Sequence, residues 1–455
     1  MTANPTPFTL HVPDVEITDL RDRLARSRFP DSAPGEAWAY GTDVAYLRDL
    51  AEYWRTKFDW RTQEAALNAF PQFRVALDDV DLHYLHVPGV GPDPMPLLLS
   101  HGWPGSVFEF LEIIPRLTDP ARFGGDARDA FTVVAPSLPG YGLSFQPGMK
   151  RFGVPEMGDA VAALMTDVLG YRKFGAQGGD WGSAVTSRLG YAYPDRMIGI
   201  HINLMMAAGR DPADFLNPTE EEQRYLDDLK HWMREETGYQ WIQGTKPQTL
   251  AFALTDSPAG LAAWIAEKFR SWSDCGGTIE NAIPRDRMLA DISLYWFTGS
   301  IGASFWPYYA RLHGSAILPP GEKISVPTGY AQFPHEMLKP PRRAAEKVFT
   351  DIRRWSSRSC SRARCRLFSA TCGDEARDQS PLRSSGTSPN LFSSCASPNS
   401  PAIGSPVRLN ATAPTLPVAR DNASARRTAP DGLWHSSAAP ATGAPVSSCK
   451  NGSAT

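Results

Sequence analysis

Five consecutive residues combine a carboxylate with the glycines that a tight turn needs. Gly178-Gly-Asp-Trp-Gly182 has the G-x-nucleophile-x-G spacing of a nucleophile elbow, with Asp180 at the position that is usually serine. Glycines flank such a turn because it is narrow and holds its nucleophile in a strained conformation. An ordinary glycine-rich turn or a phosphate-binding loop is the alternative. The position of the pentad between an expected strand and an expected helix favours the elbow.

An aspartate nucleophile limits the reactions that the site could catalyse. A carboxylate that attacks an sp3 carbon forms an alkyl ester, which water must then hydrolyse. The attacked carbon must carry a leaving group, either a halide or the oxygen of a strained epoxide. A serine in the same place would instead indicate acyl transfer.

A second loop, His101-Gly-Trp-Pro-Gly105, follows an earlier apolar segment. In this type of site such a loop gives one backbone N–H to an oxyanion hole, here that of Trp103. The residue after the nucleophile, Trp181, gives the other. His101 is a candidate base by residue type, but we expect it to shape the turn.

Strands that alternate with helices must position these two loops. The expected strands are Pro96–Ser100, Phe131–Pro136, Phe174–Gln177, Met197–Leu204, Lys323–Pro327 and the start of one more at Thr350–Trp355. The expected helices are Val107–Leu117, Val154–Leu169, Ser183–Tyr193 and Pro341–Val348. This alternation predicts an α/β fold with a mainly parallel sheet.

Two further regions flank or interrupt this alternation. The segment Val15–Leu67 has a helical pattern, and Phe73–Leu77 with Val80–Val87 reads as a hairpin. From Met205 to about Leu318 the chain is helical and rich in aromatic residues, which predicts a cap inserted between two strands. We therefore expect an N-terminal arm with the hairpin (1–90), a first core part (91–204), the cap (205–320) and a second, truncated core part (321–355).

The last hundred residues, 356–455, differ in composition from the rest. They contain no Tyr, 20 Ser, 10 Pro and five of the six Cys, and Arg outnumbers Lys ten to one. Without an apolar period this tail is expected to be disordered and to form no packed core. It reads either as a Ser/Pro/Arg-rich linker or as the out-of-frame translation of a GC-rich gene, and we favour the second.

Composition excludes several classes of function. A net charge of −3 over 455 residues argues against a general nucleic-acid binder. No apolar run is long enough to cross a membrane, and the N-terminus lacks the pattern of a signal peptide. We find no metal-ligand spacing or dinucleotide fingerprint. The expectation is a soluble cytoplasmic protein with no cofactor, no metal, no nucleic-acid partner and no membrane anchor.

Taken together, several motifs resemble the microsomal-type epoxide hydrolases of the α/β-hydrolase superfamily, from about Phe8 to Trp355. Besides the two loops above, the resemblance rests on Gly238-Tyr-Gln-Trp-Ile-Gln243, Thr245-Lys-Pro247, Leu294-Tyr-Trp-Phe-Thr-Gly299, Val326-Pro-Thr-Gly329 and Phe333-Pro-His-Glu336. It implies an α/β-hydrolase fold and the hydrolysis of apolar epoxides to vicinal diols. It also implies a part in detoxification or in the catabolism of aromatic hydrocarbons.

The resemblance also implies roles for individual residues. Asp180 matches the nucleophile and Glu336 the acid of the charge relay. Tyr239 matches one of two tyrosines that hydrogen-bond the epoxide oxygen and protonate it on opening. The second falls at Tyr308, with Tyr309 as the alternative. A phenol suits this task because it donates a proton to an alkoxide yet stays neutral at pH 7.

One family element is missing from the sequence. The relay histidine is expected in a Gly-Gly-His-Phe stretch shortly after Trp355, where this chain has 356–365 without histidine. The one later histidine, His435, lies deep in the tail. The ester should therefore hydrolyse very slowly, because nucleophile and base act as a unit.

Other functions stay open at this point. A haloalkane dehalogenase also uses aspartate, a degenerate member could bind apolar epoxides without turnover, and a pseudogene product would not fold stably. The cap aromatics suggest a pocket for bulky apolar substrates, although most are expected to pack the cap itself. The sequence leaves a homo-oligomer open.

Overall fold

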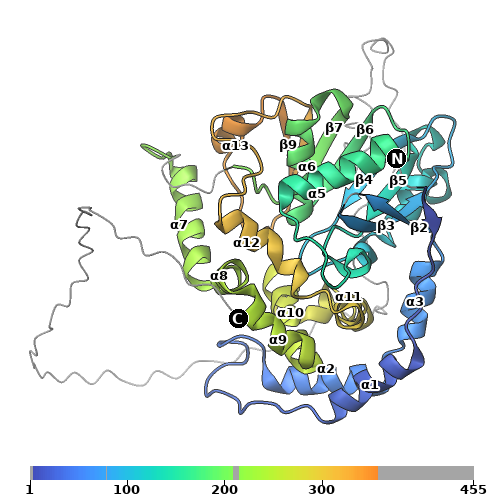
Figure 1. The fold of residues 1–455 in the computed structure, drawn as a ribbon. Coiled ribbons are helices and arrows are strands. Elements are labelled where there is room, and N and C mark those ends of the chain that lie inside the picture. Colours follow the sequence, from blue (N-terminus) through green and yellow to red (C-terminus); the bar gives the residue numbers. More distant parts are fainter. Residues whose placement is uncertain (1–3, 78, 209–214, 357–455) are drawn as a thin grey trace, which may run out of the picture. The chain divides into compact units, whose positions relative to one another are not determined.

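The computed structural model describes residues 4–77, 79–208 and 215–356. Within these ranges nine strands form one sheet in the order β1-β2-β3-β5-β4-β6-β7-β8-β9 (Figure 1). The strands are β1 (Thr6–Pro7), β2 (Gln72–Leu77), β3 (Val80–Val87), β4 (Met95–Ser100), β5 (Phe131–Pro136), β6 (Phe174–Gly178), β7 (Met197–Ile202), β8 (Thr328–Gln332) and β9 (Ile352–Ser356).

The sheet is antiparallel at one end and parallel over the rest. The antiparallel pairs are β1 with β2, β2 with β3 and β3 with β5. All pairs from β5 through β4, β6, β7 and β8 to β9 are parallel. Parallel strands end at the same edge of a sheet, so the loops after β4, β6 and β8 meet there. This is the predicted α/β-hydrolase fold.

Helices cover the sheet and build a cap over its carboxyl edge. α5 (Val154–Ala163) and α6 (Trp181–Ala192) pack together, and α6 contacts β6 and β7. Between β7 and β8 the chain forms the cap helices α7 (Glu220–Glu235), α8 (Gly238–Thr245), α9 (Pro247–Asp256), α10 (Pro258–Trp272), α11 (Arg285–Thr298) and α12 (Trp306–Leu312). α13 (Arg342–Val348) connects β8 to β9.

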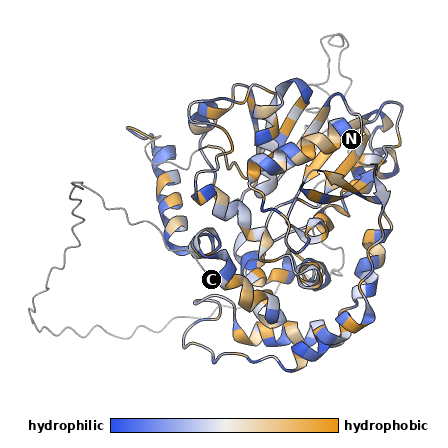
Figure 2. Ribbon diagram, in the orientation of Figure 1, coloured by the Kyte–Doolittle hydropathy of each residue, from blue (hydrophilic) through white to orange (hydrophobic). Residues whose placement is uncertain are grey.

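α7 illustrates why these segments are helical. Its buried side chains recur every three or four residues and are Glu222, Tyr225, Leu229 and Trp232. Figure 2 shows α7 as a largely hydrophilic helix interrupted by hydrophobic positions. Thr219 caps the helix: its hydroxyl accepts from the Glu222 amide, and the Glu222 carboxylate accepts from the Thr219 amide.

The N-terminal arm is attached to the cap. Its helices α1 (Asp14–Ala25), α2 (Val44–Thr56) and α3 (Trp60–Asn68) run beside the cap helices in Figure 1. The buried Trp54 donates its indole N–H to Ser293 of α11 at 3.0 Å. The arm therefore shares a packed core with the helices that cover the site.

Two expected helices are interrupted. The segment Val107–Leu117 forms a 3-10 turn (Val107–Phe110) and then α4 (Ile114–Thr118), because Pro115 lacks an amide and fits only the first turn of a helix. The helix from Val154 ends in a π turn (Leu164–Val168), in which Leu164 and Met165 are buried.

The strand expected at Lys323–Pro327 was wrong in position. Ile324 makes only an isolated bridge to Phe349, and the strand β8 begins after Pro327. All five residues of β8 are buried although they include Thr, Gly and Gln. Their low hydropathy hid the strand from a search for apolar runs. The domain boundaries at residues 90, 204, 320 and 355 stay a prediction.

Candidate active site

The elbow between β6 and α6 holds Asp180 in a conformation that side chains rarely adopt. Asp180 has φ +47° and ψ −126°, and strain of this kind costs about 1–3 kcal/mol. Gly178 and Gly182, two residues to either side, must be glycine for lack of space. A Cβ on Gly178 would lie 2.1 Å from the Gly182 carbonyl oxygen, and one on Gly182 would lie 1.9 Å from that of Ser100. The turn thus lifts the carboxylate above the sheet edge.

A backbone amide of the loop after β4 binds the Asp180 carboxylate. The Trp103 amide donates to Asp180 Oδ1 at 2.9 Å. Trp181 is the first residue of α6, where an amide has no acceptor within its own helix and the helix dipole favours negative charge. The loop after β4 therefore brings the Trp103 amide to the nucleophile, while the role of the Trp181 amide in an oxyanion hole stays a prediction.

His101 is a structural residue of this loop. Its ring is buried, Nε2 accepts from the Leu138 amide at 3.1 Å, and Nδ1 lies 3.1 Å from the Gly102 carbonyl oxygen. Burial lowers the pKa of His101 to about 4. Both ring nitrogens are engaged and the ring is neutral at pH 7, as expected for a residue that shapes the turn.

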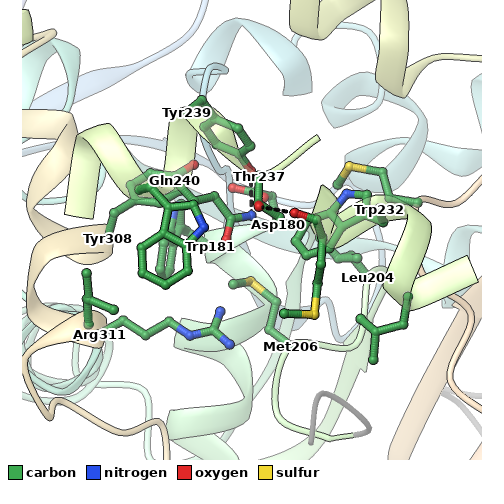
Figure 3. A pocket seen from close by; sticks show the side chains of 15 residues that line it. Asp180, Trp181, Leu204, Met206, Trp232, Thr237, Tyr239, Gln240, Tyr308 and Arg311 are labelled. Atoms are coloured by element: carbon green, nitrogen blue, oxygen red, sulfur yellow. Dashed lines mark hydrogen bonds between the residues drawn. The ribbon is translucent and has the colours of Figure 1, made fainter. Parts of the chain in front are cut away.

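Two tyrosines of the cap face the same cavity as Asp180. The Tyr239 and Tyr308 rings lie 5.7 Å apart at 77°. Tyr239 stacks on Trp103, with centroids 5.5 Å apart and planes at 10°, and Tyr308 packs edge-on against Trp181 at 4.8 Å. Figure 3 shows both tyrosines and Asp180 around this space.

The structure distinguishes the two candidates for the second tyrosine. Tyr308 is buried beside the site, and burial raises its pKa well above the ordinary value, with Tyr239 and Asp180 adding to the effect. Tyr309 instead stacks on the His313 ring at 3.9 Å. Of the two candidates, Tyr308 is therefore the one that lines the cavity together with Tyr239.

The cavity between core and cap is mostly apolar. It encloses about 250 Å³ and is lined by Asp180, Trp181, Leu204, Met206, Leu229, Trp232, Met233, Thr237, Tyr239, Gln240, Trp241, Tyr308, Arg311, Leu312 and Met337. Of the aromatic cap residues singled out in the sequence, Trp241 lines this cavity and Phe305 is fully buried.

Glu336 borders a second cavity that also reaches Asp180. It follows β8, as the sequence predicted, and lines a space of about 410 Å³ together with Asp180, Trp103, Trp272 and His335. On the same wall, His335 Nε2 lies 3.3 Å from an Asp274 carboxylate oxygen. The stretch expected to carry the relay histidine, 357–365, lies outside the described residues, as does His435.

Sequence reasoning missed three polar residues near Asp180. Glu109 and Lys268 line a further cavity with it, and Gln240 contacts Tyr239. Loss of solvent around its carboxyl, followed by the charges of Asp291 and Asp180, raises the pKa of Glu109 above its ordinary value, although the residue keeps an exposed surface. Glu109 could have been found from the sequence, because it is an acidic residue within the apolar run 107–111. Lys268 and Gln240 carried none, because only the fold brings them to the site.

Known proteins resemble this chain in sequence and in fold. Residues 5–110 match the family described as epoxide hydrolase N terminus, and residues 95–239 match the alpha/beta hydrolase fold. Epoxide hydrolase 1 of Oryctolagus cuniculus is 37% identical over 74% of this chain and 79% of its own length. A relative in Stigmatella aurantiaca, assigned to the epoxide hydrolases, is 44% identical over 77% of this chain and 79% of its own.

The chain belongs to the epoxide hydrolase family. Solved members share its architecture: the juvenile hormone epoxide hydrolase of Bombyx mori has a TM-score of 0.65 at 29% identity, covering 78% of this chain and 87% of its own. The Aspergillus niger epoxide hydrolase also has a TM-score of 0.65 at 29% identity, covering 78% and 90%.

The described residues lack two kinds of feature. Among their helices, none combines the length and the apolar character that crossing a membrane requires. Over the same residues, no cluster of three or more His, Cys, Asp or Glu side chains forms a metal-binding group.

Proposed function

We propose that Asp180 opens an apolar epoxide by forming an alkyl ester, with Tyr239 and Tyr308 as donors to the epoxide oxygen. The observation that carries this proposal is the meeting of a strained, amide-bound carboxylate with two phenols in one apolar cavity. The activities of the related epoxide hydrolases support it.

In the first step an Asp180 oxygen bonds to an epoxide carbon while the carbon–oxygen bond of the ring breaks. The oxygen that leaves takes a proton from a tyrosine. The carboxylate has lost its charge and the tyrosine has become a phenolate. Phenols are suited to this because they donate only to the alkoxide that develops in the transition state.

In the second step water must attack the ester carbonyl. The negative oxygen that forms there is stabilised by the amides of Trp103 and Trp181. The diol leaves, Asp180 regains its charge, and a proton returns to the phenolate. Glu336 would orient a base for this water, and the sequence lacks the histidine for that role in 356–365. The ester is therefore expected to persist.

The rival functions make different products. A haloalkane dehalogenase would release halide, whereas a binding protein would retain its ligand unchanged. The paired tyrosines favour the epoxide, since a halide leaves as an anion and needs no proton.

A burst experiment separates these functions. Purified protein is mixed with excess styrene oxide, and epoxide and diol are quantified over time. A matched sample receives 1-bromobutane, and bromide is measured. The proposal predicts rapid loss of about one epoxide per chain, followed by slow diol release, and no bromide. Sustained bromide release, or epoxide recovered in full, would contradict it.

A further inference from the structure

We propose that Lys268 and Gln240 are positioning residues that stabilise Tyr239 as it gives up its proton, which makes Tyr239 the acid of ring opening. This inference rests on the proposed function and adds to it a division of labour between the two tyrosines.

Lys268 places a buried cation against the Tyr239 ring. Its side chain is 8% exposed, and Nζ lies 4.9 Å from the centroid of Tyr239 and 5.5 Å from that of Trp272. A desolvated cation on an aromatic face is strongly attracted to it, and more so once the ring carries negative charge. Glu267 at 2.5 Å and Glu236 at 3.8 Å hold the ammonium there.

Gln240 acts on the oxygen of the same residue. Its side-chain amide donates to Tyr239 Oη at 2.9 Å, a contact drawn in Figure 3. A donor to a phenolic oxygen binds the phenolate more tightly than the phenol. This bond uses the oxygen as an acceptor and does not involve the tyrosine's own proton.

Both contacts stabilise the negative charge that ring opening places on Tyr239. The negative charge starts on Asp180 and ends on Tyr239 Oη when the ring oxygen takes the phenolic proton. Lys268 lines one cavity with Asp180, so the charge moves within the field of one cation. Glu109 lines that cavity too and places a second carboxyl beside Asp180.

Tyr308 has different surroundings. It approaches Tyr239 from α12, and its ring meets the edge of Trp181. Burial and the charge of Asp180 raise its pKa well above the ordinary value. Tyr308 is thus suited to hold the epoxide oxygen by a hydrogen bond, and Tyr239 to release its proton.

The test measures the alkylation half-reaction alone. Parent protein and the variants Lys268→Met, Lys268→Arg and Gln240→Leu are mixed with excess styrene oxide, and the rate of adduct formation is followed by quenched-flow intact mass from pH 6 to pH 10. Lys246→Met serves as the matched control, because Lys246 is an exposed lysine at the end of α8.

We expect Lys268→Met to slow alkylation about tenfold and to move the alkaline fall of the rate about one unit higher. Gln240→Leu should slow it several-fold, while Lys268→Arg and Lys246→Met stay within about threefold of the parent. A Lys268→Met rate and pH profile equal to the parent's would overturn the inference. So would Lys268→Arg as slow as Lys268→Met, since that result indicates packing. Absence of any adduct in the parent would instead refute the proposed function itself.

Discussion

Replacing Gly102 by alanine should disable the nucleophile without unfolding the protein. A Cβ at this position would lie 2.4 Å from Asp180 Cβ and 2.5 Å from its Oδ1. Ordinary contact begins at 3.4 Å, so Asp180 Cβ and the elbow backbone that carries it must shift by about 1 Å relative to the loop. The bond from the Trp103 amide to Oδ1 would be lost or stretched with it. A displacement of this size lowers the rate of an oriented reaction about 100-fold.

The assay is the rate of adduct formation with styrene oxide, measured by intact mass. Gly238→Ala is the matched control, since a Cβ on Gly238 would meet nothing within 4 Å. Circular dichroism and the melting temperature establish that both variants fold. Gly102→Ala should alkylate about 100-fold more slowly and Gly238→Ala at the parent rate. A folded Gly102→Ala variant that alkylates as fast as the parent would refute the placement of Asp180 against this loop.

Three further predictions concern the second cavity, the two tyrosines and the buried Asp291. Imidazole at millimolar concentration should speed diol release tenfold or more, because the cavity between Asp180 and Glu336 has about 410 Å³ of space for a small base; a rate that is flat in imidazole would contradict this. Tyr239→Phe and Tyr308→Phe should each slow alkylation about 100-fold in the same assay, and unchanged rates would remove the tyrosines from the mechanism. Burial raises the pKa of Asp291 to about 7. Between about pH 4, near the ordinary pKa, and pH 7 the folded state therefore keeps a proton that the unfolded state has released. This carboxyl destabilises the fold increasingly as the pH rises through that range. Urea unfolding should therefore show Asp291→Asn gaining stability over the parent by up to about 1.4 kcal/mol per pH unit in that range, and a constant difference would count against the buried acid.

The sequence predicts the nucleophile turn well because its constraints are local. Gly178 and Gly182 are fixed by the lack of space around the elbow, and that demand is visible as a pentad in the chain. The same holds for the parallel strands β4 and β5, which are short apolar runs. Such features depend on neighbours along the chain, so pattern alone finds them.

Features that depend on tertiary contacts were displaced or missed. β8 is buried by its partners β7 and β9 despite its low hydropathy, so the pattern placed a strand too early. Lys268 is polar and lies 29 residues after Tyr239, and only the packing of α10 on α8 brings it over that ring. No period or spacing encodes a contact of this kind.

The most direct test of the account is the mass of the peptide that contains Asp180 after exposure to an epoxide. Protein is incubated with styrene oxide, quenched in acid, digested and mapped by tandem mass spectrometry, with Asp180→Asn as the control. The account predicts that this peptide gains the mass of one epoxide at Asp180, and that the control peptide does not. Consumption of the epoxide with the Asp180 peptide unmodified at every time point, or an adduct on another side chain, would contradict it.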